Sequence, residues 1–256
     1  MFNPANNPFL VFVVSLAIFW LSAFVGSRLS KSKWKLPEIT HADFKFVLGG
    51  ALTLLGLIVG FTFSMAVGRY DQRKNYEEEE ANAIGTEYLR ADLLAAPDAA
   101  NVRSLLTNYL DKRINDFKSR DMQRRPQIDA ETARLQNRMW AAVSGPATAQ
   151  PTPLTALVAA GMNDVLNSQG FSQAAWWNRV PIEAWALLVM ISIFCNLLIG
   201  YGAQGRAVFV LFILPVVLSV SLFLIAEIDS PRGGLIHIRP HNLESLSQSL
   251  QPAANQ

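Results

Sequence analysis

The chain has 256 residues, of which 51% are hydrophobic and only 16% are charged. Soluble domains carry roughly 25% charged residues, so this composition indicates a membrane protein. The formal net charge of +2 gives no indication of a nucleic-acid partner. The single cysteine, Cys195, excludes an intrachain disulfide.

Four uncharged apolar segments are each long enough to cross a bilayer. A hydrocarbon core of about 30 Å requires about 20 helical residues. We predict transmembrane helices at about 9–27, 46–68, 183–203 and 207–227. A cleavable signal peptide is the alternative for the first segment, but that segment lacks the basic residues that begin such peptides. The predicted fold class is all-α: a polytopic membrane protein with four transmembrane helices in two hairpins, residues 1–68 and 181–227.

A polar stretch, residues 69–180, lies between the two predicted hairpins, and its apolar residues follow helical spacing. We predict a helical extramembrane domain there, with helices that begin after Asp98, Asp129 and Thr152 as N-caps. Its linkers are predicted at 123–127 and 144–151.

The segments at the two ends of this polar domain connect it to the predicted membrane helices. Residues 70–94 contain no proline and one glycine, so the second membrane helix can continue into the domain. Trp176, Trp177 and Trp185 are expected at the membrane boundary, where indole rings are enriched. The tail, residues 228–256, is expected to form a turn, a short extended piece and a loose end.

Two stripes of residues recur at every fourth position of the second predicted membrane helix. Spacing of four places the members of each stripe on one helix face. The small stripe allows another backbone to approach closely, either as plain helix packing or around a pore. The apolar stripe would form stacked rings around a symmetry axis, and such rings can gate a pore by dewetting. The small stripe is Gly56, Gly60, Ser64 and Gly68, and the apolar stripe is Thr53, Leu57, Phe61 and Met65.

Three segments, 60–73, 80–94 and 228–236, carry a resemblance to a known family. Together they resemble a bacterial family of bestrophin-like membrane proteins, and the first of them distantly resembles the pore helix of bestrophin anion channels. Their polar motif residues are Arg69, Asp71, Glu80, Asn82, Arg90, Asp229, Pro231 and Arg232.

The resemblance implies a homo-oligomeric channel, pentameric as in bestrophins, that conducts small anions through a pore lined by the second membrane helix. The neck positions of bestrophins fall on Thr53, Leu57 and Phe61, of which only Phe61 keeps the aromatic ring. No acidic calcium-binding clasp is found in the tail. The resemblance also implies a bacterial inner membrane, with both termini and the middle domain in the cytoplasm; basic residues are balanced on the two sides and do not choose an orientation.

Glu77, Glu78, Glu79 and Glu80 form an acidic run shortly after this helix. Three interpretations stay open: a solvated helix face, pairing with basic residues such as Arg90 or Arg103, or a charged vestibule ring. The run counts against a simple anion pore unless it is neutralised.

Other polar residues allow both structural and functional interpretations. Asn82 and Thr86 share a face and could form a polar interface between subunits. Asp229 and Arg232 could pair with each other or with Arg69 at the end of the fourth membrane helix. Ser192 and Asn196 are expected to make interhelical hydrogen bonds.

Signals for catalysis are poor. His237 and His241 have the spacing of two metal ligands on one helix face, but Pro240 between them interrupts any helix. We therefore expect no metal site from the three histidines. No nucleophile or nucleotide-binding motif is present in the sequence, so we expect no enzyme and no cofactor. The alternative to a channel is a non-conducting membrane scaffold or sensor whose helical domain binds a partner. The two differ in whether the apolar stripe faces a central axis or the third and fourth membrane helices.

Overall fold

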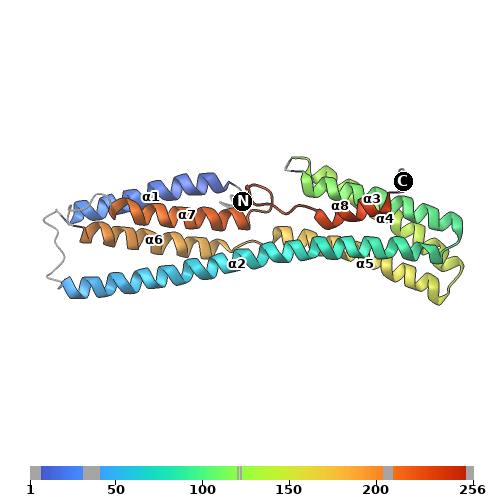
Figure 1. Cartoon of the computed structure of the whole chain (residues 1–256), viewed down its shortest axis with the longest axis horizontal. Helices are drawn as coiled ribbons and strands as arrows, with labels where there is room; N and C mark the ends of the chain where they lie inside the picture. The colour runs from blue at the N-terminus through green and yellow to red at the C-terminus, as the bar shows by residue number, and fades with distance from the viewer. Residues whose placement is uncertain (1–6, 31–40, 120, 122, 204–209, 252–256) are drawn as a thin grey trace. The chain divides into compact units, whose positions relative to one another are not determined.

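The computed structural model describes residues 7–30, 41–119, 121, 123–203 and 210–251. These residues form helices and turns, and none of them lies in a β-strand (Figure 1). The helices are α1 (Pro8–Leu29), α2 (His41–Arg90), the short 3₁₀ helix η2 (Ala91–Leu93), α3 (Ala96–Lys118), α4 (Arg125–Ala149), α5 (Pro153–Trp177), α6 (Ile182–Gly202), α7 (Val210–Asp229) and α8 (His241–Leu250).

The chain divides into two compact units. The first unit contains residues up to Tyr70 and from Arg179 to His237, and the second contains Asp71–Asn178 and the chain from Ile238 onward. Four helices are long and apolar enough to cross a membrane, and they include α1, the first part of α2, α6 and α7. The prediction of four membrane-spanning segments in an all-helical protein is therefore supported in its coarse form; their arrangement as two hairpins stays a prediction.

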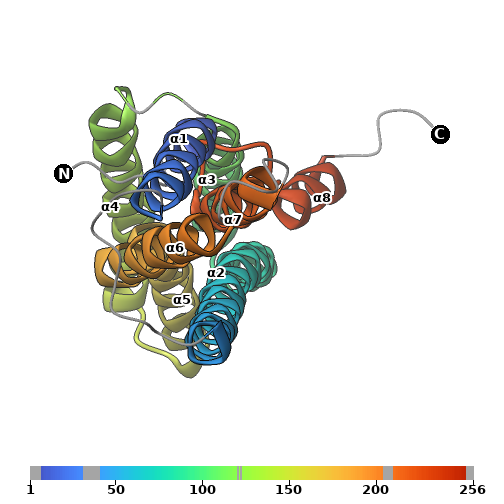
Figure 2. The ribbon, with the colours of Figure 1, turned by 90° about the vertical axis from the view of Figure 1, so that its left-hand side faces the viewer.

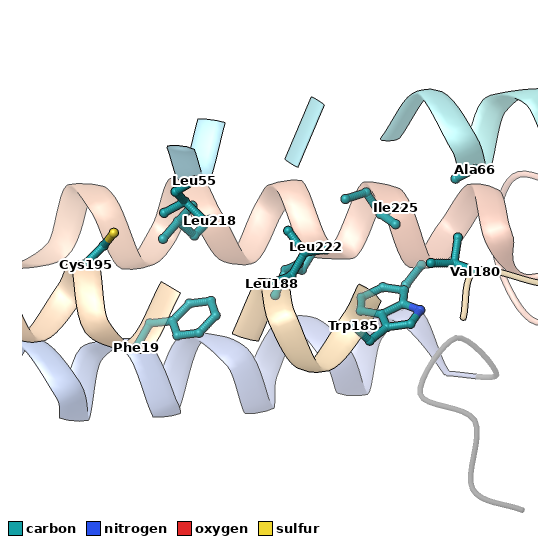
Figure 3. Close-up of a cluster of buried hydrophobic side chains, with 11 residues drawn as sticks. Phe19, Leu55, Ala66, Val180, Trp185, Leu188, Cys195, Leu218, Leu222 and Ile225 are labelled. Atoms are coloured by element: carbon teal, nitrogen blue, oxygen red, sulfur yellow. The ribbon is translucent and has the colours of Figure 1, made fainter. Parts of the chain in front are cut away.

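In the first unit, α1 packs against both α6 and α7 (Figure 2). Glycine permits the close contact with α6: a Cβ atom at Gly26 or Gly200 would collide with the backbone of Leu197 or Ala23, respectively. Side chains from α1, α2, α6 and α7 build an apolar core (Figure 3), which includes Trp185. Trp185 lies in the first turn of α6 and is only 5% exposed, so its ring packs against neighbouring helices; its predicted place at the membrane boundary stays a prediction.

The second unit is built from the second part of α2, η2, α3, α4, α5 and α8. Its apolar core includes Val102, Leu106 and Leu110 of α3, Met139 of α4 and Met162 of α5, all fully buried. The amphipathic spacing in the sequence predicted these faces, because residues three and four apart share one side of a helix. The expected continuation of the second membrane helix is confirmed, since α2 runs without a break to Arg90.

Two predicted helix starts and both predicted linkers need correction. α3 begins at Ala96, with Pro97 in its first turn, and Asp98 lies inside the helix. α4 begins at Arg125 with Pro126 in its first turn, so Asp129 is also internal and the linker at 123–127 is too long. α4 then continues through Pro146 to Ala149, which removes most of the linker at 144–151. A proline in the first turn loses no intrahelical hydrogen bond, and for this reason it marks the start better than the acid after it.

The start of α5 is as predicted. The Thr152 hydroxyl accepts a hydrogen bond from the Thr155 N–H, and the Thr155 hydroxyl accepts one from the Thr152 N–H. This reciprocal capping box satisfies two backbone donors that a helix start otherwise leaves free.

The predicted loose end after residue 240 is wrong. Residues His241–Leu250 form α8, which packs against α3 and buries Leu243 completely. The helix lacks a local side-chain cap. Its stability depends on contacts with residues far away in the sequence, which local spacing does not reveal.

Candidate functional site

Within the first unit, α2 turns both of its stripes away from the other helices. It buries Leu55, Thr62 and Ala66, which are at most 4% exposed. All eight stripe residues are exposed, and Leu57 and Phe61 are 52% and 65% exposed. The apolar stripe therefore does not face α6 or α7 within one chain.

The small stripe leaves open space beside the helix. A Cβ atom added at Gly56, Gly60 or Gly68 would meet no atom from another part of the described chain within 4 Å. The glycines at the α1–α6 contact, in contrast, have no space for a Cβ. The small residues of α2 are thus not required for packing inside a single chain.

The composition of the exposed α2 face differs from that of the other membrane helices. α2 exposes five glycines, Thr53 and Ser64 beside its apolar residues. The other helices mainly expose large apolar side chains, which suit lipid; examples are Trp20 and Leu21 of α1, Phe194 of α6, and Val217 and Leu224 of α7. A face rich in small residues is typical of contacts between membrane helices.

In the second unit, the acidic run separates into two buried and two exposed carboxylates. Glu78 and Glu79 are exposed, whereas Glu77 and Glu80 are at most 1% exposed. The interpretation of the whole run as a solvated face or as a vestibule ring is therefore wrong for Glu77 and Glu80. A charged side chain is buried only where hydrogen bonds or an opposite charge compensate it.

Glu80 belongs to a buried ion-pair network between α2 and α3. Arg113 donates to both carboxylate oxygens of Glu80 and, at 2.8 Å, to Asp116 Oδ2. Arg125 of α4 also pairs with Asp116, and the Ser172 hydroxyl of α5 donates to Glu80 at 3.0 Å. The partner of Glu80 is thus Arg113, and neither Arg90 nor Arg103.

These buried charges also affect a neighbouring phenol. Burial, together with the nearby Glu80 carboxylate, raises the pKa of Tyr109. The network joins α2, α3, α4 and α5, so its role is to fix the packing of the second unit.

Glu77 caps α8. Its Oε1 atom accepts hydrogen bonds from the N–H groups of Asn242 and Leu243, each at 3.0 Å, and its Oε2 atom accepts one from the Asn242 side chain at 2.7 Å. A carboxylate at a helix N-terminus satisfies free N–H groups and interacts favourably with the helix dipole. Sequence reasoning missed this role, because the two partners are far apart in the chain.

Other motif residues on the second part of α2 are divided between the surface and the interior. Asp71, Asn82 and Thr86 are exposed. Arg73 is 1% exposed and donates to the carbonyl oxygens of Ala175 and Asn178, each at 3.1 Å. Of the two basic residues that follow Asp71 in this segment, Arg73 is thus buried and Lys74 is exposed.

Arg69 and Arg90 are both partly buried. The Arg90 guanidinium lies 3.9 Å from the Asp164 carboxylate of α5.

The third motif segment is an ordered turn after α7. Asp229 accepts a hydrogen bond from the Val180 N–H at 2.9 Å, and Glu227 accepts from the Leu235 N–H at 2.6 Å. Gly234 lies against Glu227, so that a Cβ atom there would collide with the carboxylate. Pro231 is buried and Arg232 partly buried. The segment forms structure around the end of α7.

Ser192 and Asn196 are both buried in α6. The amide of Asn196 donates to the Ser192 carbonyl at 2.7 Å, inside the same helix. This hydrogen bond lies within α6 and is therefore not the interhelical hydrogen bond that the sequence predicted.

Four helices able to span a bilayer and a helical second unit define a multi-pass helical membrane protein. The model of the bestrophin-like domain family matches residues 9–243. The chain therefore belongs to the bestrophin-like family. No curated protein sequence matches it.

Solved structures show the same fold. A bacterial bestrophin homologue from Klebsiella pneumoniae that carries one substitution has a TM-score of 0.64 at 14% identity, over 95% of this chain and 97% of that chain. A second structure of a bestrophin homologue from Klebsiella pneumoniae gives 0.64 at 15% identity, over 94% and 96% of the two chains. A further crystal structure, described as a membrane protein, gives 0.66 at 15% identity over 93% and 96%. At these identities the likeness concerns the fold alone.

Proposed function

We propose that the protein is a subunit of a homo-oligomeric membrane channel in which the membrane part of α2 lines the central axis. The observation that carries this proposal is the exposure of Thr53, Leu57, Phe61 and Met65 on a helix whose opposite face is packed. In a ring of subunits, this face would turn inward and stack as successive apolar rings, which resist wetting.

The small stripe supports contact between copies. Gly56, Gly60, Ser64 and Gly68 share the exposed side of α2 and leave room for a close neighbour. In a membrane, lipid tails are as apolar as the helix surfaces, so no hydrophobic force drives helices together, and such close packing is a main source of association. Five subunits, a bacterial inner membrane and cytoplasmic placement of the termini and the second unit follow by analogy with bestrophins.

Family analogy and local charge favour different ions. The resemblance to bestrophins favours small anions. In the segment after the membrane part of α2, three acids (Asp71, Glu78 and Glu79) and one base (Lys74) are exposed, and this excess of acids favours cations. The reversal potential under a chloride salt gradient separates the two, because its sign reports which ion carries the current.

The test is purification of the full chain, measurement of its subunit number, and conductance of that oligomer in a planar bilayer. We expect a defined oligomer with an ion current that protein-free bilayers lack. A monomer, or an oligomer without current in repeated reconstitutions, would contradict the proposal. The protein would then fit the other class, a non-conducting scaffold or sensor whose second unit binds a partner.

A further inference from the structure

Glu87 of α2 is a fully buried acid that the proposed channel does not use. The residue has no exposed surface, and neither carboxylate oxygen has a hydrogen-bond partner among the residues that the structure describes. The other buried acids of this helix, Glu77 and Glu80, accept hydrogen bonds from Asn242, Leu243 and Arg113. A buried carboxylate without such partners strongly favours its neutral, protonated form.

The packing around Glu87 leaves the side chain little room. Its carboxylate lies against Gly161 of α5, at a point where a Cβ atom on the glycine would collide with Glu87 Oε2. The guanidinium of Arg90 occupies the same place beside Gly161. Glycine at position 161 thus lets the acid and the base of α2 lie directly against the α5 backbone.

The charges around Glu87 offset its burial only in part. Arg90, less than one turn further along α2, lies 3.9 Å from Asp164 on α5 and is shared with that acid. On α3, Arg103 pairs with Asp92 and donates to the Tyr88 carbonyl, so its charge is directed elsewhere.

We propose that Glu87 is a proton-binding site at the contact of α2 with α5, and that loss of its proton loosens this contact. The Arg90 guanidinium already lies beside the Glu87 carboxylate at Gly161 but is shared with Asp164, so an ionised Glu87 would still need water. Water can reach it only if the contact with α5 opens, because Glu87 has no exposed surface. The proposal rests on contacts within the second unit and holds whether or not the oligomer conducts.

The pH range follows from linkage. Burial, and to a smaller extent Asp164, raise the pKa of Glu87 to about 8, while Arg90 acts in the opposite direction. Between the unfolded pKa, about 4.3, and the folded value, the folded chain holds a proton that the unfolded chain has lost. The stabilisation by this group is therefore complete at low pH and is lost as the pH rises toward 8. Over this range the equilibrium constant for opening increases by about tenfold per pH unit.

Hydrogen exchange of the detergent-solubilised full chain at pH 6 and pH 9 tests the proposal, with Glu87→Gln measured at each pH as the reference. For the amides of residues 84–90 and 158–164, the measured quantity is the exchange rate of the wild type divided by that of Glu87→Gln at the same pH. We expect this ratio to be at least tenfold higher at pH 9 than at pH 6. Glu79→Gln, an exposed acid on the same helix, is the matched control and should behave like the wild type. Infrared spectra at pH 6 should show the C=O band of a protonated carboxylic acid that Glu87→Gln removes.

A second variant keeps the test decisive if Glu87→Gln does not fold. Asp164 is 68% exposed, so Asp164→Asn should fold and release Arg90 toward Glu87. The exchange transition of Asp164→Asn should then move to lower pH than that of the wild type. The proposal is overturned if the protection ratio does not depend on pH, if the infrared band persists in Glu87→Gln, or if Asp164→Asn leaves the transition unchanged.

Discussion

Glu77 and Asn242 are 165 positions apart in the chain, yet the carboxylate of one accepts both the backbone and the side-chain N–H groups of the other. The contact holds α8 on the second unit by supplying the cap that the helix lacks locally. Lys118 of α3 adds an ion pair to Glu244 at 2.7 Å, and its hydrogen bond lowers the pKa of that carboxyl.

Replacement of Glu77 by alanine should detach α8. The change leaves the N–H groups of Asn242 and Leu243 without acceptors, at a cost of about 1–3 kcal/mol. Limited proteolysis with mass spectrometry should show faster cleavage within residues 241–250. Glu78→Ala, an exposed neighbour in the same run, is the control; equal cleavage of the two variants would show that the cap does not hold the helix.

The buried pair of Glu80 and Arg113 should be sensitive to loss of either partner. Arg113→Met would leave two buried carboxylates, Glu80 and Asp116, without their shared cation, and such a loss costs about 3–5 kcal/mol. Thermal unfolding in detergent should show a large decrease in Tm.

An exposed pair between α3 and α4 provides the comparison. Lys112 lies 2.6 Å from Glu131, and this hydrogen bond lowers the pKa of Glu131, but both side chains are open to water. Lys112→Met should change the Tm little, because water screens exposed pairs. A similar decrease for Lys112→Met and Arg113→Met would contradict the role given to the buried network.

Two glycines of the first unit should respond differently to the same change. At Gly200, a leucine would collide with the α1 backbone at Ala23, so Gly200→Leu should reduce the folded yield of the protomer. At Gly60 no other part of the described chain lies within 4 Å of an added Cβ, so Gly60→Leu should fold but assemble poorly if the small stripe is a contact between copies. Cross-linking and size-exclusion chromatography in detergent measure assembly; normal assembly of Gly60→Leu would mean that this stripe faces lipid or open space.

The sequence predicted the fold well where the signal is local. Long apolar segments identified the membrane helices, and helical spacing identified the buried face of α3, since both depend on neighbours within a few turns. For α5 the same spacing correctly predicts Val158, Met162 and Val165 as buried but wrongly predicts Leu154 and Leu157, which are exposed. The continuous α2 was expected because no proline interrupts it. The family was recognised from three short segments.

The parts that sequence reasoning missed depend on contacts between distant segments. Burial of Glu77 and Glu80, the docking of α8 and the unpaired Glu87 all require α2 to meet partners on α3, α5 or α8. A run of four glutamates is most often a solvated face. The sequence offers no signal that the first and the last of them turn inward, Glu77 to Asn242 and Glu80 to Arg113. Such sites can be predicted only when the packing of distant helices against each other is known, because local composition does not encode it.

The last prediction concerns the proposed narrow part of the pore. Leu57 and Phe61 are exposed within one chain, so changing both to alanine removes no contact from the protomer core. In an axial pore, the change widens and shortens the apolar constriction. Water then enters more easily, because a wider and shorter apolar segment opposes wetting less. Liposome ion flux should therefore increase, and Leu57→Ala alone should have a smaller effect because Phe61 is bulkier.

Leu55→Ala is the matched control on the same helix. Leu55 is 2% exposed and belongs to the core of the first unit, so its truncation leaves a cavity that costs about 2–5 kcal/mol in soluble proteins. We expect this variant to lose thermal stability without an increase in flux per folded oligomer. If the double variant at Leu57 and Phe61 instead loses stability as Leu55→Ala does and conducts no ions, these residues pack against a neighbouring helix. The function would then lie outside the membrane part of α2.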